Sequence, residues 1–257
     1  MESSVTGAWR EMKPGLQLYS VRDEADKDLP GVLEAIAQMG YRGVEFAGFL
    51  GYDPRDLRRY LDSLGLAAIG THTHFIEIEQ SARQVIQDHH TLGATYCTVP
   101  YFKADTVDAW REFADRLNQW GDRFKEAGLR LGYHNHHFEF EPLEDTTPFD
   151  ILRQVCHPDL VHLELDVAWA QKGGHNPATL IASLGAQSPL IHIKDLSGTG
   201  GDVNLGEGVV DMAAVLKAAD QAGVVWGIVE RDSAPPPTLE SAKINLEVLR
   251  GLLPDSR

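Results

Sequence analysis

The sequence predicts a single (β/α)8 barrel over residues 1–257, and three observations support this prediction. The chain has 257 residues, which is close to the usual length of one such barrel. Short, mostly apolar β-rich segments alternate with longer stretches of helical periodicity. No low-complexity linker or shift in composition divides the chain, so one domain is the simplest interpretation.

Eight β-rich segments are expected to form the barrel strands. They are Leu16–Ser20, Gly43–Phe46, Ala67–Thr71, Thr95–Val99, Arg130–His134, Val161–Asp166, Leu190–Ile193 and Val224–Glu230. Helix-like stretches such as VDAWREFADRLNQWGDRFKEAG fill most of the intervals, and Gly40, Gly65, Gly128 and Gly223 follow four of them as C-terminal caps. Apolar strands between helices imply a parallel sheet, and closure into a barrel removes its edges. An open doubly wound sheet is the alternative, but the first turn, YSVRDEADKD, lacks a glycine-rich phosphate loop.

Composition excludes several classes of function. Acidic residues outnumber Lys and Arg by 38 to 23, and the net charge of −15 argues against nucleic acid as a partner. No apolar run approaches the roughly 18 residues that span a bilayer, so we expect no membrane role. The start, MESSVTGAWREMKPG, lacks the features of a secretory signal, which predicts a loose polar leader and a cytoplasmic protein. Cys97 and Cys156 lie in apolar stretches and are expected to be reduced core thiols.

The ends of the predicted strands are rich in His, Asp and Glu. In a (β/α)8 barrel these C-terminal ends carry the active site. Side chains alternate along a strand, so Leu163 and Leu165 mark one face and leave His162, Glu164 and Asp166 on the other. An acidic residue directly after a strand commonly caps the next helix, which we expect of Asp195 and Asp232.

Four of these polar residues, Glu139, Asp166, His192 and Glu230, are expected to converge on one point. Buried carboxylates and imidazoles without a cation would repel one another or need shifted pKa values. A single divalent metal ion resolves this conflict. Mixed carboxylate and imidazole ligands suit Mn2+, our first expectation, and also Mg2+, Co2+ or Zn2+.

The chain resembles the xylose isomerase-like barrel superfamily over nearly its whole length, in particular the sugar phosphate isomerases and epimerases. The resemblance rests on GLQLYSVRDE, GYRGVEFAGF, GYHNHHFEFEP, ELDVAWAQKGG, PLIHIKDLS and WGIVERD, in this order. It implies that Asp166, His192 and Glu230 bind a metal. The fourth ligand of the family is a Glu on the fifth strand, where this chain has His134. Either His134 is the ligand by position, or Glu139, slightly further along, reaches back to supply the carboxylate, and we prefer Glu139 because it keeps the two-carboxylate site.

A second departure from the family concerns substrate binding. Ketose epimerases of the family have a substrate-binding His three residues after the sixth-strand Asp, and this chain has Trp169. Trp169 argues against a simple ketose epimerase and offers a stacking surface for a pyranose or cyclitol ring, although a helix-packing role is the alternative. The residues expected to meet substrate, with Gln17 beside them on the rim, are Glu45, His72, His74, His134 and Trp169.

These residues predict an isomerase or epimerase acting on a sugar or keto-sugar through an enediolate. Glu230 or Glu139 is expected to move the proton next to the carbonyl, and Lys194 and His136 to contact substrate oxygens. The alternative is a lyase or dehydratase of a 3-keto-glycoside or inosose, which the segment YHNHHFEF favours because relatives with a histidine-rich fifth strand include inosose dehydratases.

Two further classes of function fit the sequence less well. An abasic-site endonuclease of the same superfamily is a remote alternative, because the acidic balance opposes DNA binding. A non-catalytic sugar-binding barrel would not need carboxylates and a metal. The expected partner is a small, unphosphorylated sugar or cyclitol, and a homo-oligomer remains open.

Overall fold

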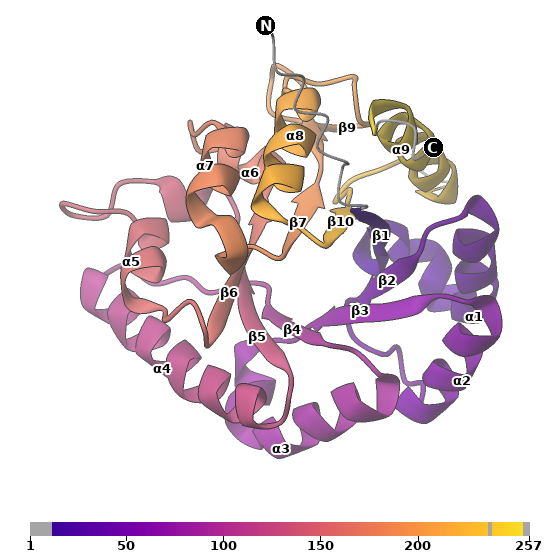
Figure 1. Cartoon of the computed structure of the whole chain (residues 1–257), viewed down its shortest axis with the longest axis horizontal. Helices are drawn as coiled ribbons and strands as arrows, with labels where there is room; N and C mark the ends of the chain where they lie inside the picture. The colour runs from indigo at the N-terminus through magenta and orange to yellow at the C-terminus, as the bar shows by residue number, and fades with distance from the viewer. Residues whose placement is uncertain (1–11, 236–237, 254–257) are drawn as a thin grey trace, which may run out of the picture.

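A computed structural model describes residues 12–235 and 238–253 of the chain. Within these residues, eight parallel strands close into a barrel that helices surround (Figure 1). The strands are β1 (Lys13–Gln17), β2 (Gly43–Phe46), β3 (Ala67–His72), β4 (Tyr96–Val99), β5 (Arg130–His134), β6 (Val161–Asp166), β7 (Leu190–Ile193) and β10 (Trp226–Val229). β10 pairs with β1 and closes the barrel. The predicted (β/α)8 barrel is therefore confirmed, while most of the predicted polar leader lies outside the described residues.

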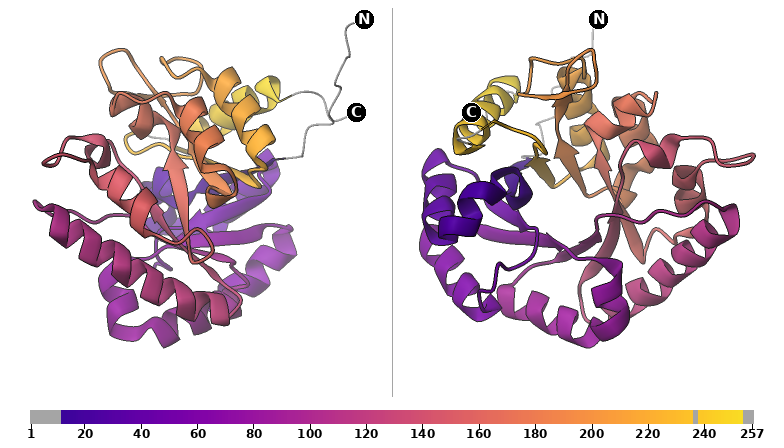
Figure 2. Two further views of the ribbon diagram at one scale, coloured as in Figure 1. Left: turned by 60° about the vertical axis from the view of Figure 1, so that its left-hand side comes forward. Right: turned by 180° about the vertical axis from the view of Figure 1, so that it is seen from behind.

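The helices lie outside the strands, as Figure 2 shows from two further directions. They are α1 (Arg22–Met39), α2 (Pro54–Leu64), α3 (Phe75–Leu92), α4 (Val107–Glu126), α5 (Pro148–Val155), α6 (Val167–Lys172), α7 (Pro177–Leu184), α8 (Met212–Ala222) and α9 (Thr238–Leu252). Short 3-10 helices follow as η1 (Leu18–Val21), η2 (Phe138–Phe140) and η3 (Gly185–Gln187). α9 packs beside α1 and covers the join between the two ends of the barrel.

Local sequence explains where the helices begin and end. At the start of α2, the Asp53 carboxylate accepts a hydrogen bond from the backbone N–H of Arg55, and Pro54 occupies the first turn. The predicted glycine caps are confirmed at Gly40, Gly65 and Gly223, which have positive φ at the ends of α1, α2 and α8. α4 ends one residue earlier than predicted, at a cap formed by Ala127, with the positive-φ glycine directly after it.

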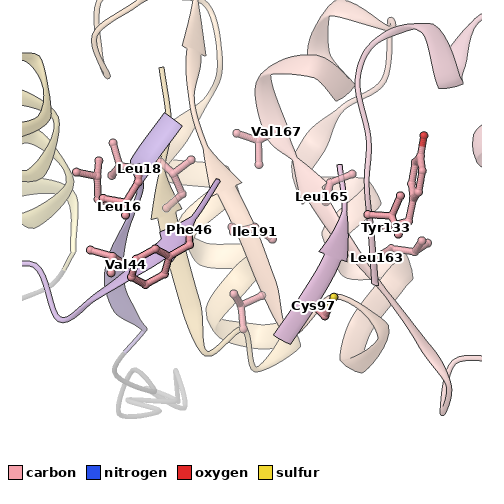
Figure 3. Close-up of a cluster of buried hydrophobic side chains, with 14 of the residues drawn as sticks. Leu16, Leu18, Val44, Phe46, Cys97, Tyr133, Leu163, Leu165, Val167 and Ile191 are labelled. Atoms are coloured by element: carbon pink, nitrogen blue, oxygen red, sulfur yellow. The ribbon is translucent and has the colours of Figure 1, made fainter. Parts of the chain in front are cut away.

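Alternating strand residues separate two layers of side chains. The outward-facing set packs against the helices, and Figure 3 shows Leu163 and Leu165 of β6 and Val167 at the start of α6 in this layer, together with Val44 and Phe46 of β2. All five side chains are buried. This packing fixes the phase of β6 as predicted, so the even-numbered residues of the strand face the barrel interior.

The barrel interior is apolar at its N-terminal half and polar at its mouth. Ile69, Tyr96, Leu190, Trp226 and Ile228 form a separate buried cluster, and each precedes the polar residues of its own strand. This apolar layer closes the bottom of the barrel. The polar side chains are therefore held at the C-terminal ends of the strands, where barrel enzymes carry their active sites.

Gly132 of β5 leaves the room that one buried histidine needs. A Cβ at this position would lie 2.2 Å from Nε2 of His162, so the ring fits only against a glycine. His162 contacts the Tyr96 ring below and the Thr98 hydroxyl, 3.3 Å from its Nε2. It therefore marks the boundary between the apolar and polar layers.

The structure differs from the sequence prediction at two places near the mouth. The first strand begins and ends earlier than predicted, because Leu18–Val21 turn into η1. The segment after β7 contains a short antiparallel pair, β8 (Asp195–Leu196) with β9 (Asp202–Val203), that was not predicted. Cys97 and Cys156 are free and buried, as predicted. Among the described helices, none combines the length and the apolar character needed to cross a bilayer.

Candidate active site

The mouth of the barrel gathers polar side chains from seven of the eight strand ends. Each comes from the interior-facing set of its strand or from the residue just after it. They are Gln17, Glu45, His72, His134, Glu164, Asp166, His192, Lys194 and Glu230, and all except His72 are buried. A concentration of buried charge at a strand end is typical of a catalytic site.

His192 of β7 lies at the centre of this polar layer. Its Nδ1 is 2.9 Å from Oε2 of Glu230. Its Nε2 is 2.8 Å from Oε2 of Glu45 and 2.5 Å from Oε1 of Glu164. One imidazole therefore contacts carboxylates from three other strands, although each ring nitrogen carries at most one hydrogen.

Two overlapping groups of side chains have the composition and spacing of a metal site. We name the group closer to the mouth the outer group; it consists of His134, Asp166, His192 and Glu230. The inner group consists of His72, His134, Glu164 and His192. In each group, one ligand atom from every residue lies within 4.8 Å of the others. The outer group unites three of the four predicted ligands, with His134 in the place expected of Glu139.

Unpaired buried atoms show that both groups fit a cation. Within the described residues, Oδ2 of Asp166, Nδ1 of His134, Nε2 of His72 and Oε1 of Glu45 have no hydrogen-bond partner. Neither carboxylate oxygen of Glu164 has one either. Buried carboxylates without full hydrogen bonding are costly, and a divalent cation would compensate them. Carboxylate oxygens and imidazole nitrogens together suit Mn2+ or Zn2+.

The protonation of these groups follows from burial and from their neighbours. Burial opposes a charge on His192, but Glu164 and Glu230 outweigh it and raise the pKa of His192 well above its usual range. Burial, together with His192, lowers the pKa of His134 well below its usual range, which keeps this imidazole neutral. Burial raises the pKa of Asp166 to about 7, although the nearby ammonium group of Lys194 lowers it. Metal binding at such a site competes with these protons.

Lys194 supplies a buried positive charge beside the outer group. Its Nζ is 3.7 Å from Oε2 of Glu230 and 3.9 Å from Oδ2 of Asp166, and it donates a hydrogen bond to Asp232. The ammonium group also lies 4.4 Å from the centre of the Trp169 ring. Asp232 therefore pairs with Lys194, which corrects the expectation that it serves only as a helix cap.

Glu139 does not point at the outer group. It lies in the 3-10 turn η2, where its carboxylate accepts hydrogen bonds from the Tyr133 hydroxyl at 2.7 Å and from the backbone N–H of His136 at 2.8 Å. Burial raises the pKa of Glu139 to about 7. The structure places His134, and not the preferred Glu139, in the outer group, because the turn η2 brings the Glu139 carboxylate to Tyr133 and to the backbone of His136.

His136 and Trp169 lie together at the edge of the mouth. Their ring centres are 5.9 Å apart, and His136 also stacks on Phe138 and contacts the exposed ring of Tyr101. Burial lowers the pKa of His136 to about 4, so the imidazole is neutral. The indole Nε1 of Trp169 is buried without a hydrogen-bond partner within the described part of the chain. These rings form an aromatic wall next to the outer group.

His74, predicted to bind substrate, lies elsewhere. Its Nδ1 accepts a hydrogen bond from the backbone N–H of Ile76 at 3.3 Å, which caps the start of α3. Its ring stacks on Phe75, which belongs to the outer apolar layer. His74 belongs to neither the outer nor the inner group, and its evident role is local.

Two residues of the site were not selected from the sequence, namely Glu164 and Asp232. The alternation along β6 had already placed Glu164 on the same face as Asp166, so the signal was present. Glu45 and His72 were selected as substrate ligands, but they lie against Glu164 and His192. Oε2 of Glu45 is 3.4 Å from Nε2 of His72 and accepts a hydrogen bond from the Gln17 amide at 2.8 Å.

Asp195, also expected to cap a helix, instead organises the loop after β7. Its Oδ1 accepts hydrogen bonds from the backbone N–H groups of Leu196 and Val210, and its Oδ2 from those of Gly206 and Gly208. The distances are 2.9 to 3.1 Å. One buried carboxylate thereby holds both ends of the loop that flanks the mouth.

Asp195→Asn is expected to lower the free energy of unfolding by about 2–4 kcal/mol. The substitution replaces one acceptor oxygen by an NH2 group, so two buried backbone N–H groups lose their hydrogen-bond acceptor. Urea denaturation followed by circular dichroism measures this change. Zinc or manganese content is expected to stay as in the wild type, since Asp195 belongs to neither group. An equal loss of metal would show that the loop shapes the site directly.

Comparison with known proteins agrees with this architecture. Residues 33–252 match the family model described as xylose isomerase-like TIM barrel. An inosose dehydratase from Lacticaseibacillus casei is 26% identical over 250 aligned residues, which cover 79% of this chain and 82% of the relative. An inosose dehydratase from Geobacillus kaustophilus is 25% identical over 211 residues, covering 71% and 65% of the two chains.

Solved structures share the fold over almost the whole chain. A sugar phosphate isomerase/epimerase from Parabacteroides distasonis superposes with a TM-score of 0.83 at 22% identity and covers 96% of both chains. The zinc-containing IolI protein gives a TM-score of 0.76 at 17% identity, covering 94% of this chain and 98% of its own. At these identities, the likeness establishes the barrel fold.

Proposed function

This chain belongs to the xylose isomerase-like TIM barrel family, and from this premise we propose that it is a metal-dependent lyase of a cyclic keto-sugar or inosose. The reaction removes the proton on the carbon next to the carbonyl and expels a hydroxyl or alkoxyl group from the following carbon. The sequence analysis ranked an isomerase or epimerase first. We reverse that order because His134 of β5 belongs to the outer group.

The observation that carries the choice is that His134, and not a carboxylate, comes from β5 into the outer group. Epimerisation needs a base and an acid on opposite faces of one carbon, whereas elimination needs a base for one proton and an acid for the leaving group. Oδ1 of Asp166 already accepts hydrogen bonds from two backbone N–H groups of α6. Among the described residues, the Glu230 carboxylate accepts no such hydrogen bond from backbone N–H groups. Glu230 is therefore the carboxylate of the outer group that we assign as the base.

His134, Asp166, His192 and Glu230 would hold the divalent ion. Such an ion supplies positive charge that stabilises the negative charge developing on the carbonyl oxygen as the proton leaves. We test Mn2+ first, followed by Zn2+, Co2+ and Mg2+. Two carboxylates and two imidazoles can bind each of these ions.

The surrounding residues supply the remaining chemistry. Glu230 accepts the proton from carbon, and Lys194, 3.7 Å from its Oε2, holds the carboxylate in place. His136 is neutral and carries an N–H group, so it donates a hydrogen bond to the departing oxygen. The C–H bond breaks as Glu230 takes the proton, and the C–O bond breaks as protonated Glu230 passes this proton to the departing oxygen. Water or an alcohol leaves, and a C=C bond conjugated with the carbonyl forms. Trp169 and Tyr101 supply the aromatic wall for the ring of the substrate.

The inosose dehydratases among the relatives support this class of substrate, since both named relatives align over more than two thirds of this chain.

Turnover of inososes and 3-keto-glycosides by metal-free and metal-reloaded protein tests the proposal. Formation of the conjugated enone is followed by its ultraviolet absorbance. Turnover is expected only after reloading, and Asp166→Asn is expected to lose both metal and turnover. Equal turnover by the metal-free protein would contradict the proposed role of the ion, and an isomeric product without the enone would favour the isomerase.

A further inference from the structure

Three ligand-type side chains that the proposed reaction does not use, Glu45, His72 and Glu164, lie around His192. Nε2 of His192 lies 2.5 Å from Oε1 of Glu164 and 2.8 Å from Oε2 of Glu45. Nε2 of His72 lies 3.4 Å from the same Glu45 oxygen and 3.6 Å from Oε2 of Glu164. Two carboxylates and two imidazole nitrogens thus surround one point in the barrel.

These side chains are enclosed and incompletely paired. Glu45, Glu164 and His192 are fully buried, and only a small part of the His72 side chain reaches the surface. Within the described residues, Oε2 of Glu164, Oε1 of Glu45 and Nε2 of His72 have no hydrogen-bond partner, while Oε1 of Glu164 contacts Nε2 of His192. A single hydrogen on Nε2 of His192 cannot serve both adjacent carboxylates. The cluster therefore has unused ligand atoms in a place that water reaches poorly.

We propose that Glu45, His72, Glu164 and His192 form a second divalent cation site, which we name the inner site, and that its preferred ion is Zn2+. Four ligands in tetrahedral geometry with metal bonds near 2.0–2.1 Å lie about 3.3–3.5 Å apart. The two contacts of His72 already have nearly this spacing. The two contacts of His192 Nε2 are shorter. An ion would replace the hydrogen on this nitrogen, and the carboxylates would move apart to make room for it.

The two sites differ in what they offer an ion. The inner site offers four protein ligands, three of them fully buried, which is typical of a structural zinc site. The outer site lies beside the aromatic wall and Lys194, where a substrate can approach. The inner ion therefore has a positioning role: it would fix His72 and His192 and offset the charges of Glu45 and Glu164.

His192 belongs to both sites through different atoms. Its Nδ1 faces Glu230 of the outer group, and its Nε2 faces Glu45 and Glu164. With both sites filled, His192 would offer Nδ1 to the outer ion and Nε2 to the inner ion. His134, common to both groups, stays with the outer ion. The proposal rests on the proposed function only through this shared His192.

Metal stoichiometry of the full-length protein tests the second site without any activity measurement. Chelator-treated protein is titrated with Zn2+, desalted and analysed by inductively coupled plasma mass spectrometry. Two ions per chain are expected for the wild type, and one each for Glu164→Gln and Asp166→Asn. Calorimetry is expected to show that Glu164→Gln raises the dissociation constant of one Zn2+ at least about 100-fold, since even partners of a ligand contribute 10–100-fold.

His162→Gln is the matched control, because His162 lies on the same face of β6, two residues before Glu164, and belongs to neither group. It is expected to bind two ions. If Glu164→Gln fails to fold by circular dichroism, His72→Gln decides in its place, with one ion expected.

Saturation of the folded wild type at one ion per chain would overturn the second site. Glu45 and Glu164 would then serve only as hydrogen-bond partners of His192. Two ions in both Glu164→Gln and His72→Gln would overturn it as well. Two ions without turnover of any keto-sugar would contradict the proposed function while the inner site stands. Full turnover of a keto-sugar by protein that saturates at one ion would contradict the inner site while the proposed function stands.

Discussion

Glu230→Gln is expected to leave the barrel folded and to lower kcat by a factor of about 10²–10⁴, the usual contribution of a positioned general base. The amide keeps the shape of the side chain but cannot accept the proton from carbon. Its oxygen can still face Nδ1 of His192, which lies 2.9 Å from Oε2 of Glu230. Steady-state kinetics with saturating metal measure the change.

Glu79→Gln is the control, because this glutamate lies exposed on α3 and pairs only with Arg116 among the described residues. It is expected to keep wild-type kcat. Undiminished turnover of Glu230→Gln in protein that contains its full complement of metal would remove Glu230 from the mechanism.

His134→Ala is expected to weaken binding of the outer ion at least about 100-fold, because it removes a ligand from the outer group. Glu139→Gln is expected to change that affinity only a few-fold at most, since the Glu139 carboxylate is bonded to Tyr133 and to the backbone of His136. Isothermal titration of both variants with Mn2+ compares them directly. The opposite order of affinities would restore the carboxylate as the fifth-strand ligand.

Much of the fold could be predicted from the sequence because strands and helices in this chain have distinct periodicities. Four of the eight predicted strands, such as Val161–Asp166, have the observed bounds. The residues after Leu16–Gln17 could not be placed, since Leu18–Val21 are as apolar as a strand but turn into η1. The β8–β9 pair has strands of only two residues each, too short for any alternation to reveal.

The site could be predicted where it depends on position along a strand. Asp166, His192 and Glu230 lie at or just after strand ends, and parallel strands bring such ends together. Glu139 lies five residues beyond His134, and the intervening turn decides its direction. Local hydrogen bonding within a loop, here to Tyr133, does not follow from strand alternation.

The acidic residues after β7 and β10 illustrate a second limit of sequence reasoning. Asp195 and Asp232 both follow a strand, and helix capping is the common use of such a position. In the structure, Asp195 accepts four backbone hydrogen bonds and Asp232 pairs with Lys194. Their partners lie on the loop after β7 or on another strand end, so only the folded arrangement reveals these roles.

The most direct test of a metal-dependent elimination is proton NMR of an inosose incubated with the manganese-loaded protein in deuterated water. The account predicts that the signal of the proton next to the carbonyl disappears as a dehydrated, conjugated product accumulates, with the mass lower by one water. Metal-free protein and Glu230→Gln are expected to leave the substrate unchanged. A product of unchanged carbon and oxygen content that carries one deuterium at that carbon would contradict the elimination, because it would show epimerisation or isomerisation instead.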